Sequence, residues 1–304
     1  MSNSTSSPLL ILDPWQHAEG VSRFFHYFHL RQRRPDMPFL REILAAFSHF
    51  PYENLSKIIK LDAGYGSTYR IRLPEEVMAD YMAFRLGGTC FSLTFFLQTI
   101  LTHCGFFSYP VMADMQAGEN IHCALVVLLE GGKYLVDPGY LLHQPMELHP
   151  AGRKLFRTPF AGVEITHNPS TGRYALYTFD RVERKWRYTF TDRPTPPAEF
   201  LQHWYASFHK TMMHALCLTR ATPHGLLYVR KYFLRETTFE GKRNRNIRRN
   251  YHAVLRDLFG IREEIVEQAE LALQRNLARE RARREHHETT TPGTGQTLYR
   301  RPLQ

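Results

Sequence analysis

The sequence predicts an α+β protein built from a helical N-terminal part, an antiparallel β-barrel or curled sheet, and a small α/β unit. Three observations lead to this prediction. Apolar residues recur at helical spacing through the first hundred residues, short strand-like segments follow up to residue 193, and a proline-rich break at 194–197 precedes a mixed segment. The chain has 304 residues, 43% of them hydrophobic, which is enough for two or three such units.

The N-terminal helical domain is predicted to span residues 14–105, after a disordered N-terminus at residues 1–13. Its helix starts are recognised by apolar residues at helical spacing and by proline or acidic residues in the first turn. These starts are expected at Pro14, Pro38, Pro74 and Cys90. Residues 64–69 read as a loop between two of the helices.

The antiparallel β-barrel domain is predicted to span residues 106–193. Its strands are rich in valine, leucine and aromatic residues and are separated by glycine, proline and aspartate turns. They are expected at residues 107–115, 122–129, 134–140, 162–168, 173–179 and 185–190. The sequence Glu130-Gly131-Gly132-Lys133 predicts a tight hairpin between the second and third of them.

Residues 194–261 are predicted to form a small α/β domain, and residues 262–304 a charged helical and then disordered tail. The α/β domain is expected to contain helices at 198–207 and 247–258 and strands at 215–220 and 226–234. The leucines of the tail are too few to indicate a partner helix by themselves.

Composition narrows the classes of function. The net charge of +10 invites anionic partners, but the chain lacks zinc-finger and RNP-type patterns, which argues against a nucleic-acid partner. None of the four cysteines forms a Cys-x-x-Cys pair, which argues against a metal site, and four are too few for a secreted disulfide scaffold. The sequence shows neither a signal peptide nor an apolar run long enough for a membrane span, so we expect a cytoplasmic protein without membrane contacts.

The turn Gly87-Gly88-Thr89-Cys90 marks a candidate nucleophile. The glycines allow a sharp turn, and Cys90 then opens a long apolar helix. Unpaired N–H groups at a helix start stabilise a thiolate, which lowers the thiol pKa and increases its nucleophilic fraction. The alternative is that Cys90 is an ordinary buried cysteine that only packs in the core.

A base and an orienting acid are predicted from the hairpin that follows. His122 lies at the start of one strand and Asp137 at the end of the next, and the turn places residues near 125 opposite residues near 138. His122 and Asp137 then lie at the same open end of the hairpin. A carboxylate in this place can hold one imidazole nitrogen and turn the other toward a thiol. Alternatively, His122 is an ordinary histidine and Asp137 a turn residue.

The order and local sequence of four elements resemble the arylamine N-acetyltransferases. These elements are Pro51-Tyr52-Glu53-Asn54-Leu55, Arg85 to Cys90, Ile121-His122-Cys123-Ala124-Leu125, and Tyr134-Leu135-Val136-Asp137-Pro138-Gly139-Tyr140. The resemblance extends over about residues 14–261 and does not include the tail. It implies a helical domain, a β-barrel and an α/β lid around a Cys-His-Asp core like that of cysteine proteases and transglutaminases.

The resemblance also implies a chemistry, a ping-pong acetyl transfer of xenobiotic metabolism. Cys90 would take an acetyl group from acetyl-CoA as a thioester, His122 would move the protons, and Asp137 would fix the imidazole. The acceptor would be a small aromatic amine or hydrazine, and no metal would be needed. Other readings stay open: an amide synthase or other acyltransferase of secondary metabolism with a different acyl donor, a hydrolase with the same triad, and a catalytically degenerate binding protein.

The chain departs from the family pattern beside the nucleophile. Leu86 reads as an insertion between Arg85 and the glycines, and Ser92 and Thr94 stand where the family often has Glu and Asn. Pro138 replaces a small apolar residue, and Leu141 replaces a glycine. Basic residues that could bind CoA phosphates, or could simply form a solvated face, are Arg230, Lys231, Lys242, Arg243 and Arg245.

Overall fold

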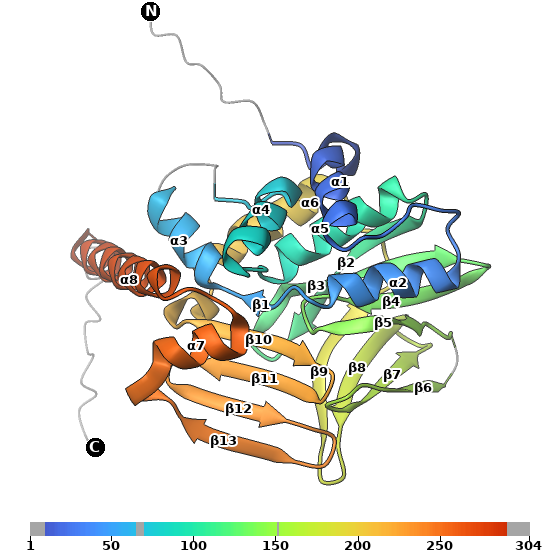
Figure 1. The fold of residues 1–304 in the computed structure, drawn as a ribbon. Coiled ribbons are helices and arrows are strands. Elements are labelled where there is room, and N and C mark those ends of the chain that lie inside the picture. Colours follow the sequence, from blue (N-terminus) through green and yellow to red (C-terminus); the bar gives the residue numbers. More distant parts are fainter. Residues whose placement is uncertain (1–9, 65–69, 151, 291–304) are drawn as a thin grey trace, which may run out of the picture.

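The computed structural model describes residues 10–64, 70–150 and 152–290. The predicted α+β class is confirmed: helices cover one side of a strongly curved sheet, and a second, smaller sheet stands beside it (Figure 1). Most of the N-terminal segment predicted as disordered, residues 65–69 of the predicted loop, and the end of the tail lie outside the described residues.

The N-terminal helices pack around α5, which is buried on almost every side. Their bounds are η1 Pro14–His17, α1 Ala18–Tyr27, α2 Met37–Phe47, α3 Leu55–Ala63, α4 Pro74–Phe84 and α5 Cys90–His103. Proline occupies the first turn of η1, α2 and α4, as the sequence predicts. Every residue from Cys90 to Leu97 is buried, because α5 is apolar nearly all round and lies between the other helices and the sheet.

The large sheet has eight antiparallel strands in the order β5-β4-β3-β2-β9-β8-β7-β6. The strands are β2 Phe107–Met115, β3 Gly118–Leu129, β4 Gly132–Asp137, β5 Leu142–Glu147, β6 Arg153–Arg157, β7 Gly162–Asn168, β8 Arg173–Phe179 and β9 Arg184–Thr191. The sheet curls until its two edge strands approach each other. Gln144 on β5 donates a hydrogen bond to the carbonyl of Arg157 on β6 at 3.2 Å, so the barrel is nearly closed.

Two of these strands, β5 and β6, are not predicted from the sequence. Both are short, and β6 exposes three of its five residues, so neither shows the apolar signal of a strand. They form the two edges of the sheet, where each strand pairs with a neighbouring strand on one side only.

The smaller sheet has five strands in the order β1-β10-β11-β12-β13. They are β1 Tyr52–Glu53, β10 Cys217–Thr222, β11 Gly225–Arg230, β12 Phe233–Thr237 and β13 Lys242–Asn246. The single strand predicted at 226–234 is wrong, since Lys231 and Tyr232 form a tight turn that splits it into β11 and β12. β1 comes from the helical domain, so this sheet is joined directly to the segment that precedes α3.

The helices that follow the barrel close the structure around α3 and α5. They are α6 Pro197–Ala206, η2 Ser207–His209, η3 Thr211–His214, η4 Arg248–Asn250, α7 Tyr251–Phe259 and α8 Glu263–Thr290. Trp204 of α6 stacks on Phe91 of α5, with ring centroids 6.1 Å apart. The tail helix α8 lies against α3 (Figure 1), where Asn276 donates to the carbonyl of Ile58 at 3.0 Å and Arg275 pairs with Asp62.

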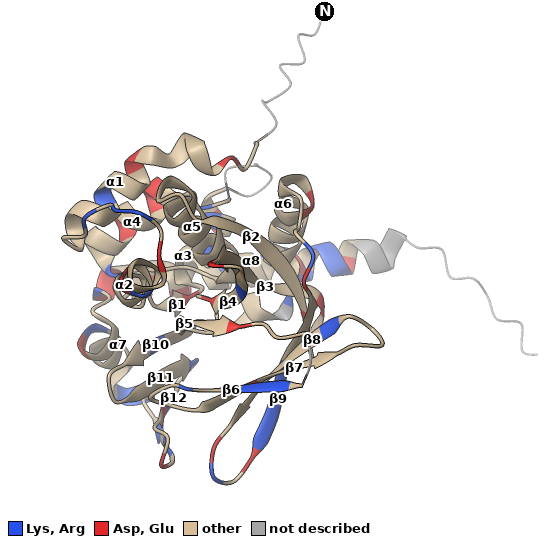
Figure 2. Ribbon diagram, turned by 90° about the vertical axis from the view of Figure 1, so that its right-hand side faces the viewer, with Lys and Arg blue, Asp and Glu red and all other residues tan. Residues whose placement is uncertain are grey.

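Charges are spread over the surface rather than confined to the tail. Basic residues occur on the barrel strands β6 and β9 as well as on α8, with acidic residues scattered among them (Figure 2). Among the described helices, none has the length and hydrophobicity to span a bilayer.

Candidate active site

The turn before Cys90 is built by close backbone contact. A Cβ atom on Gly87 would lie 1.9 Å from the carbonyl oxygen of Pro51, and one on Gly88 would lie 2.2 Å from Oγ of Ser92. Neither glycine has a positive φ, so the lack of a side chain, and not backbone conformation, is what the turn requires. The turn also pairs with β1, since Gly88 accepts a hydrogen bond from Glu53 N at 3.0 Å.

Cys90 occupies the first residue of α5 and is 7% exposed. The side chain of Thr89 does not cap the helix, and the first helical backbone bond runs from Leu93 N to Thr89 O at 3.0 Å. The N–H groups of the first turn therefore point toward the thiol region without an intrahelical acceptor. The Cys90 thiol lies 4.0 Å from the carbonyl oxygen of Ile121, at the start of the segment that carries His122.

His122 and Asp137 lie side by side on β3 and β4. His122 Nε2 is 2.8 Å from Asp137 Oδ2, and both side chains are buried. The hairpin turns on Glu130 and Gly131, which have φ of 51° and 78°, as a tight two-residue loop requires. The register differs from the predicted one by two residues, since Leu125 pairs with Val136.

The alternation of β3 explains how one strand reaches both sides of the site. Leu125 and Val127 face the helical layer, while Ala124 and Val126 face the barrel core. His122 is separated from Ala124 and Val126 by even numbers of residues, so its side chain points to the same face as theirs. This brings its ring to Asp137 and the barrel.

Cys90, His122 and Gly139 meet at one point. A Cβ atom on Gly139 would lie 2.6 Å from Cβ of Cys90 and 2.9 Å from Cε1 of His122. Because Nε2 of His122 faces Asp137, the opposite edge of the imidazole faces the cysteine. The structure thus brings together the three residues that the sequence singles out, in the order Cys90, His122, Asp137.

The electrostatics of the site favour a thiolate–imidazolium pair. A hydrogen bond with the Cys123 thiol is the largest influence on Cys90, and with the hydrogen bond and charge of His122 it outweighs burial and lowers the pKa of the Cys90 thiol well below its usual value. Burial disfavours a charged His122, but the charges and hydrogen bonds of Asp137 and Cys90 together outweigh it and raise the pKa of the imidazole to about 10. The proton is therefore held by the imidazole and the negative charge by sulfur at neutral pH.

Several residues that the sequence analysis did not single out also contact this group. Tyr188 on β9 is fully buried and donates a hydrogen bond to Asp137 Oδ2 at 2.7 Å, the same oxygen that His122 contacts. The backbone N–H of Tyr140 donates to the other oxygen, Oδ1, at 2.9 Å. Burial raises the pKa of the Tyr140 phenol to about 12, so it stays a neutral donor beside the ring of His122.

Removing the phenol oxygen of Tyr188 tests this third donor. We expect Tyr188→Phe to lower the free energy of unfolding by about 1 kcal/mol, because one buried hydrogen bond is lost. The Asp137–His122 contact remains, so the rate of Cys90 alkylation by iodoacetamide at pH 7 should fall only a few-fold, about 2- to 5-fold. Chemical denaturation and alkylation kinetics measure the two effects. An unchanged unfolding free energy would contradict the assigned hydrogen bond.

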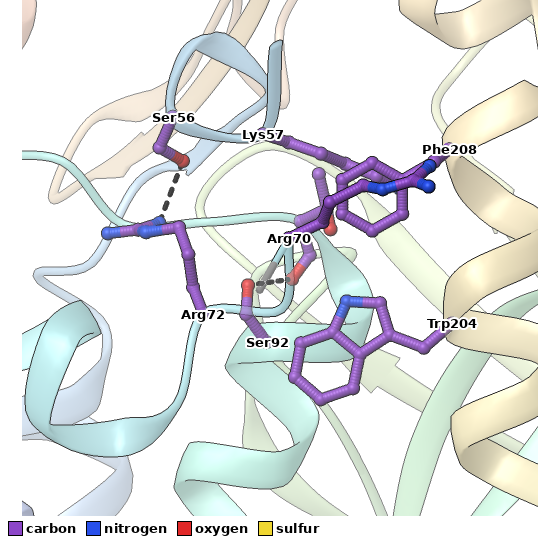
Figure 3. Close-up of a pocket in the computed structure, with 8 residues that line it drawn as sticks. Ser56, Lys57, Arg70, Arg72, Ser92, Trp204 and Phe208 are labelled. Atoms are coloured by element: carbon purple, nitrogen blue, oxygen red, sulfur yellow. Dashed lines mark hydrogen bonds between the residues drawn. The ribbon is translucent and has the colours of Figure 1, made fainter. Parts of the chain in front are cut away.

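A small pocket lies behind the nucleophile turn (Figure 3). Its volume is about 10 Å³, room for about one water molecule. It is lined by Ser56, Lys57, Arg70, Arg72, Thr89, Ser92, Trp204 and Phe208. Thr89 and Ser92 lie on either side of Cys90 in the sequence. The basic side chains of Lys57, Arg70 and Arg72 that share this pocket with them therefore lie close to the nucleophile turn. Burial lowers the pKa of Lys57 to about 8, and its ammonium donates to Ser207 at 2.5 Å.

Three of the residues that depart from the family pattern, Leu86, Ser92 and Thr94, lie close to the nucleophile turn. Arg85 ends α4 with a φ of 60° and turns away to the rings of Tyr27 and Tyr81, while Leu86 is buried. Ser92 donates to Thr89 O at 3.1 Å, and Thr94 contacts the Cys123 thiol at 3.5 Å. Thr94 therefore connects α5 to β3 one turn beyond the nucleophile.

The basic residues suggested for CoA phosphates lie at the end of β11, in the turn that follows it, and on β13. Lys242 pairs with Asp180 and Glu183 of the barrel hairpin, and Arg245 pairs with Glu236. Ion pairs occupy both of these side chains, so they act as surface contacts in this structure.

One group of the described residues could offer three ligand atoms to a metal ion: His252, Glu263 and Glu267. It lies at the α7–α8 junction on the surface. Both ring nitrogens of His252 already contact carboxylates, those of Glu263 and Glu270. The cluster therefore acts as an ion-pair network and lies apart from Cys90.

Comparison with known proteins indicates the family to which the chain belongs. Residues 36–267 match a family model described as N-acetyltransferase. A curated relative, the uncharacterized acetyltransferase YvcN of Bacillus subtilis, is 26% identical over 149 residues, 46% of this chain. That match spans only 55% of the relative's length.

Solved structures share the fold. The arylamine N-acetyltransferase from Mycobacterium abscessus superposes with a TM-score of 0.74 and 17% identity, over 87% of this chain and 96% of that one. The enzyme from M. tuberculosis gives 0.70 and 19%, over 83% and 99%, and the one from Salmonella typhimurium 0.68 and 18%, over 83% and 98%. The family model covers most of the chain, and these folds agree with it: the chain belongs to the arylamine N-acetyltransferase family.

Proposed function

We propose that this protein is an acetyl-CoA-dependent N-acyltransferase that moves an acetyl group through a Cys90 thioester to an arylamine or arylhydrazine. The observation that carries the proposal is the Cys90 thiol at the start of α5 beside a His122–Asp137 pair joined at 2.8 Å. This arrangement supplies a thiolate, a proton carrier and a group that fixes the carrier.

The first half-reaction follows from the charges of the site. The Cys90 thiolate attacks the thioester carbonyl of acetyl-CoA, and a carbon–sulfur bond forms. The free N–H groups of the first turn of α5 stabilise the oxyanion, since they carry partial positive charge. The intermediate then breaks the bond to the CoA sulfur, and the departing thiolate takes the proton from His122. The products are acetyl-Cys90 and CoA.

The second half-reaction uses the neutral imidazole left by the first. An aromatic amine attacks the acetyl-Cys90 carbonyl, and His122 accepts the proton that the amine loses. The carbon–sulfur bond breaks and returns the Cys90 thiolate, with His122 again protonated and held by Asp137. Burial and the nearby charge of Cys90 both raise the pKa of the Tyr52 and Tyr140 phenols, so two aromatic side chains lie near the nucleophile.

Intact-mass spectrometry after incubation with a panel of acyl-CoA thioesters tests the proposal. We expect one acetyl group per chain with acetyl-CoA, its loss on addition of an arylamine, and no adduct on Cys90→Ser. Cys217→Ser is the matched control, since Cys217 is also a free buried cysteine but lies on β10. Its acylation should equal that of the wild type.

Each other outcome selects a different function. Acylation by carrier-protein thioesters but not by acetyl-CoA would indicate an amide synthase with another acyl donor. Release of free acid without amide product would indicate a hydrolase. No acylation by any thioester, together with an ordinary thiol pKa at Cys90, would indicate a binding protein that retains only the fold.

A further inference from the structure

A buried arginine from outside the catalytic motifs contacts the turn that carries the nucleophile. Arg72 precedes α4 and is only 4% exposed. Its Nη1 donates a 2.7 Å hydrogen bond to the carbonyl oxygen of Gly87, three residues before Cys90. The same nitrogen donates to Ser56 Oγ at 2.7 Å, which is the contact drawn in Figure 3.

Arg72 also contacts two carboxylates. Nη2 donates to Asp80 Oδ2 of α4 at 2.7 Å, and Nη1 lies 3.5 Å from Glu53 Oε1 on β1. Glu53 has no exposed surface, and Ser56 donates to it from both its backbone N–H, at 2.9 Å, and its hydroxyl, at 2.5 Å. One guanidinium therefore joins α4, the start of α3, β1 and the glycine turn. A planar group with several donors is suited to this task, whereas an ammonium is not.

The arginine of the sequence motif does not make these contacts. Arg85 turns away from the glycines and lies on the rings of Tyr27 and Tyr81, with its guanidinium carbon 5.7 and 5.4 Å from their centroids. Leu86 takes the place next to Gly87 and brings no polar group. The cation that contacts the turn is thus Arg72, from 15 residues before Gly87.

We propose that Arg72 is a positioning residue for the nucleophile: it fixes the Gly87–Thr89 turn against β1 and thereby holds Cys90 at the start of α5 beside His122. The inference rests on the proposed function for its catalytic consequence, but not for its effect on the thiol. Arg72 contacts neither the substrate nor the sulfur, and it acts through the Gly87 carbonyl and Glu53. Glu53 N in turn donates to Gly88 O, which closes the link between β1 and the turn.

The low pKa of the Cys90 thiol depends on this placement. The hydrogen bonds of Cys90 to Cys123 and His122 both favour the thiolate, and both are lost if the helix start moves away from β3. A displacement of about 1 Å is enough to cost about 100-fold in a reaction that needs aligned groups. A loosened turn should therefore raise the thiol pKa and slow acyl transfer without changing the amine site.

The variant Arg72→Lys tests the proposal, because it keeps the charge but cannot donate to Gly87 O and Asp80 together. We expect the midpoint of the pH profile for Cys90 alkylation by iodoacetamide to rise by about one unit. We expect the single-turnover rate of Cys90 acylation to fall about 10- to 100-fold, with little change in the KM for the amine. Arg275→Lys is the matched control, since Arg275 also pairs with a carboxylate, Asp62, but on the surface of α8. It should leave both readouts at the wild-type value.

A second variant keeps the test open if Arg72→Lys folds poorly. Asp80→Asn removes the outer carboxylate, which is partly exposed, and leaves Arg72 in place. We expect a smaller rise of the alkylation midpoint in the same direction. A wild-type alkylation profile in folded Arg72→Lys, or in Asp80→Asn where the first does not fold, would overturn the proposal. Alkylation requires no acyl donor. If no thioester acylated the wild type, the proposed function would be contradicted, but the alkylation profiles of the variants would still test the role of Arg72.

Discussion

Replacing Asp137 with asparagine should lower the rate of Cys90 acylation by acetyl-CoA about 10²- to 10⁴-fold, while the protein stays folded. Asp137 has no exposed surface, and its Oδ2 accepts hydrogen bonds from both His122 and Tyr188. An asparagine fills the same space but presents a donor at one of its two positions. At least one of the groups that now donate to the carboxylate must change its role.

The loss is large because the change reaches the proton on the imidazole. With an amide N–H₂ facing it, Nε2 of His122 becomes an acceptor, and the ring proton moves to Nδ1 on the cysteine side. A neutral imidazole in this tautomer cannot take a proton from the thiol. The pKa of His122, now about 10, should fall toward its ordinary value of about 6.5 because the charge of Asp137 no longer supports the cation.

The sign of the pH dependence follows from the same shift. In the wild type the thiol pKa is lowered, so alkylation of Cys90 should already be fast at pH 6 to 7 and should change little as the pH rises further. In Asp137→Asn the imidazolium partner is lost near neutrality, so the thiol pKa rises. Alkylation should then be slow at pH 7 and should increase through a midpoint nearer to about 8.5.

Asp192→Asn is the matched control for this prediction. Asp192 lies in the same barrel, accepts a 2.7 Å hydrogen bond from the phenol of Tyr109 and pairs with Lys133, but it does not touch the site. Its alkylation profile should coincide with that of the wild type. A profile for Asp137→Asn that also coincides would show that the carboxylate does not set the state of the thiol.

The elements of the site that lie close together in the sequence could be predicted from it. The tight loop at Glu130 and Gly131 predicts a hairpin that places His122 and Asp137 at the same open end, although the observed register differs from the predicted one by two residues. The glycine turn and the apolar run after it likewise place Cys90 at a helix start. Local rules were sufficient here, because each of these features is decided within about fifteen residues.

The remaining contacts depend on pairing between distant segments. Tyr188 reaches Asp137 only because β9 pairs with β2, which in turn pairs with β3. The sequence of the strand that contains Tyr188 does not determine which strand it pairs with, so its phenol could not be assigned to the site. Cys123 is a similar case, since its contact with Cys90 depends on how α5 lies across β3.

Arg72 and Arg85 show how a motif can mislead. Arg85 is the arginine of the sequence motif and precedes the glycines, from which Leu86 alone separates it. The left-handed conformation of Arg85 instead directs the chain so that its side chain points to α1, while a buried arginine from the preceding loop contacts Gly87. Proximity in sequence does not fix which cation satisfies a buried carbonyl.

Gly139→Ala should reduce the rate of acyl transfer by about 100-fold or more through geometry alone. The added Cβ would lie 2.6 Å from Cβ and 3.1 Å from Cα of Cys90, and 2.9 Å from Cε1 of His122. These distances are too short for carbon atoms, so one of the three groups must move. Cys90 begins a helix that is buried through Leu97, and β4 is held by Asp137, so the cheapest movement separates the thiol from the imidazole.

The effect of Gly139→Ala should appear as a changed reaction and not as a lost fold, because the substitution adds one methyl group in a position without a positive φ. We expect a higher midpoint for Cys90 alkylation, since the hydrogen bond to His122 is weakened, together with slower acylation in single-turnover experiments. Gly241→Ala is the matched control, as a Cβ there meets no atom within 4 Å and needs no unusual backbone conformation. If Gly139→Ala acylates as fast as Gly241→Ala, the nucleophile and the imidazole do not meet where the structure places them, and the catalytic role of the pair fails with that result.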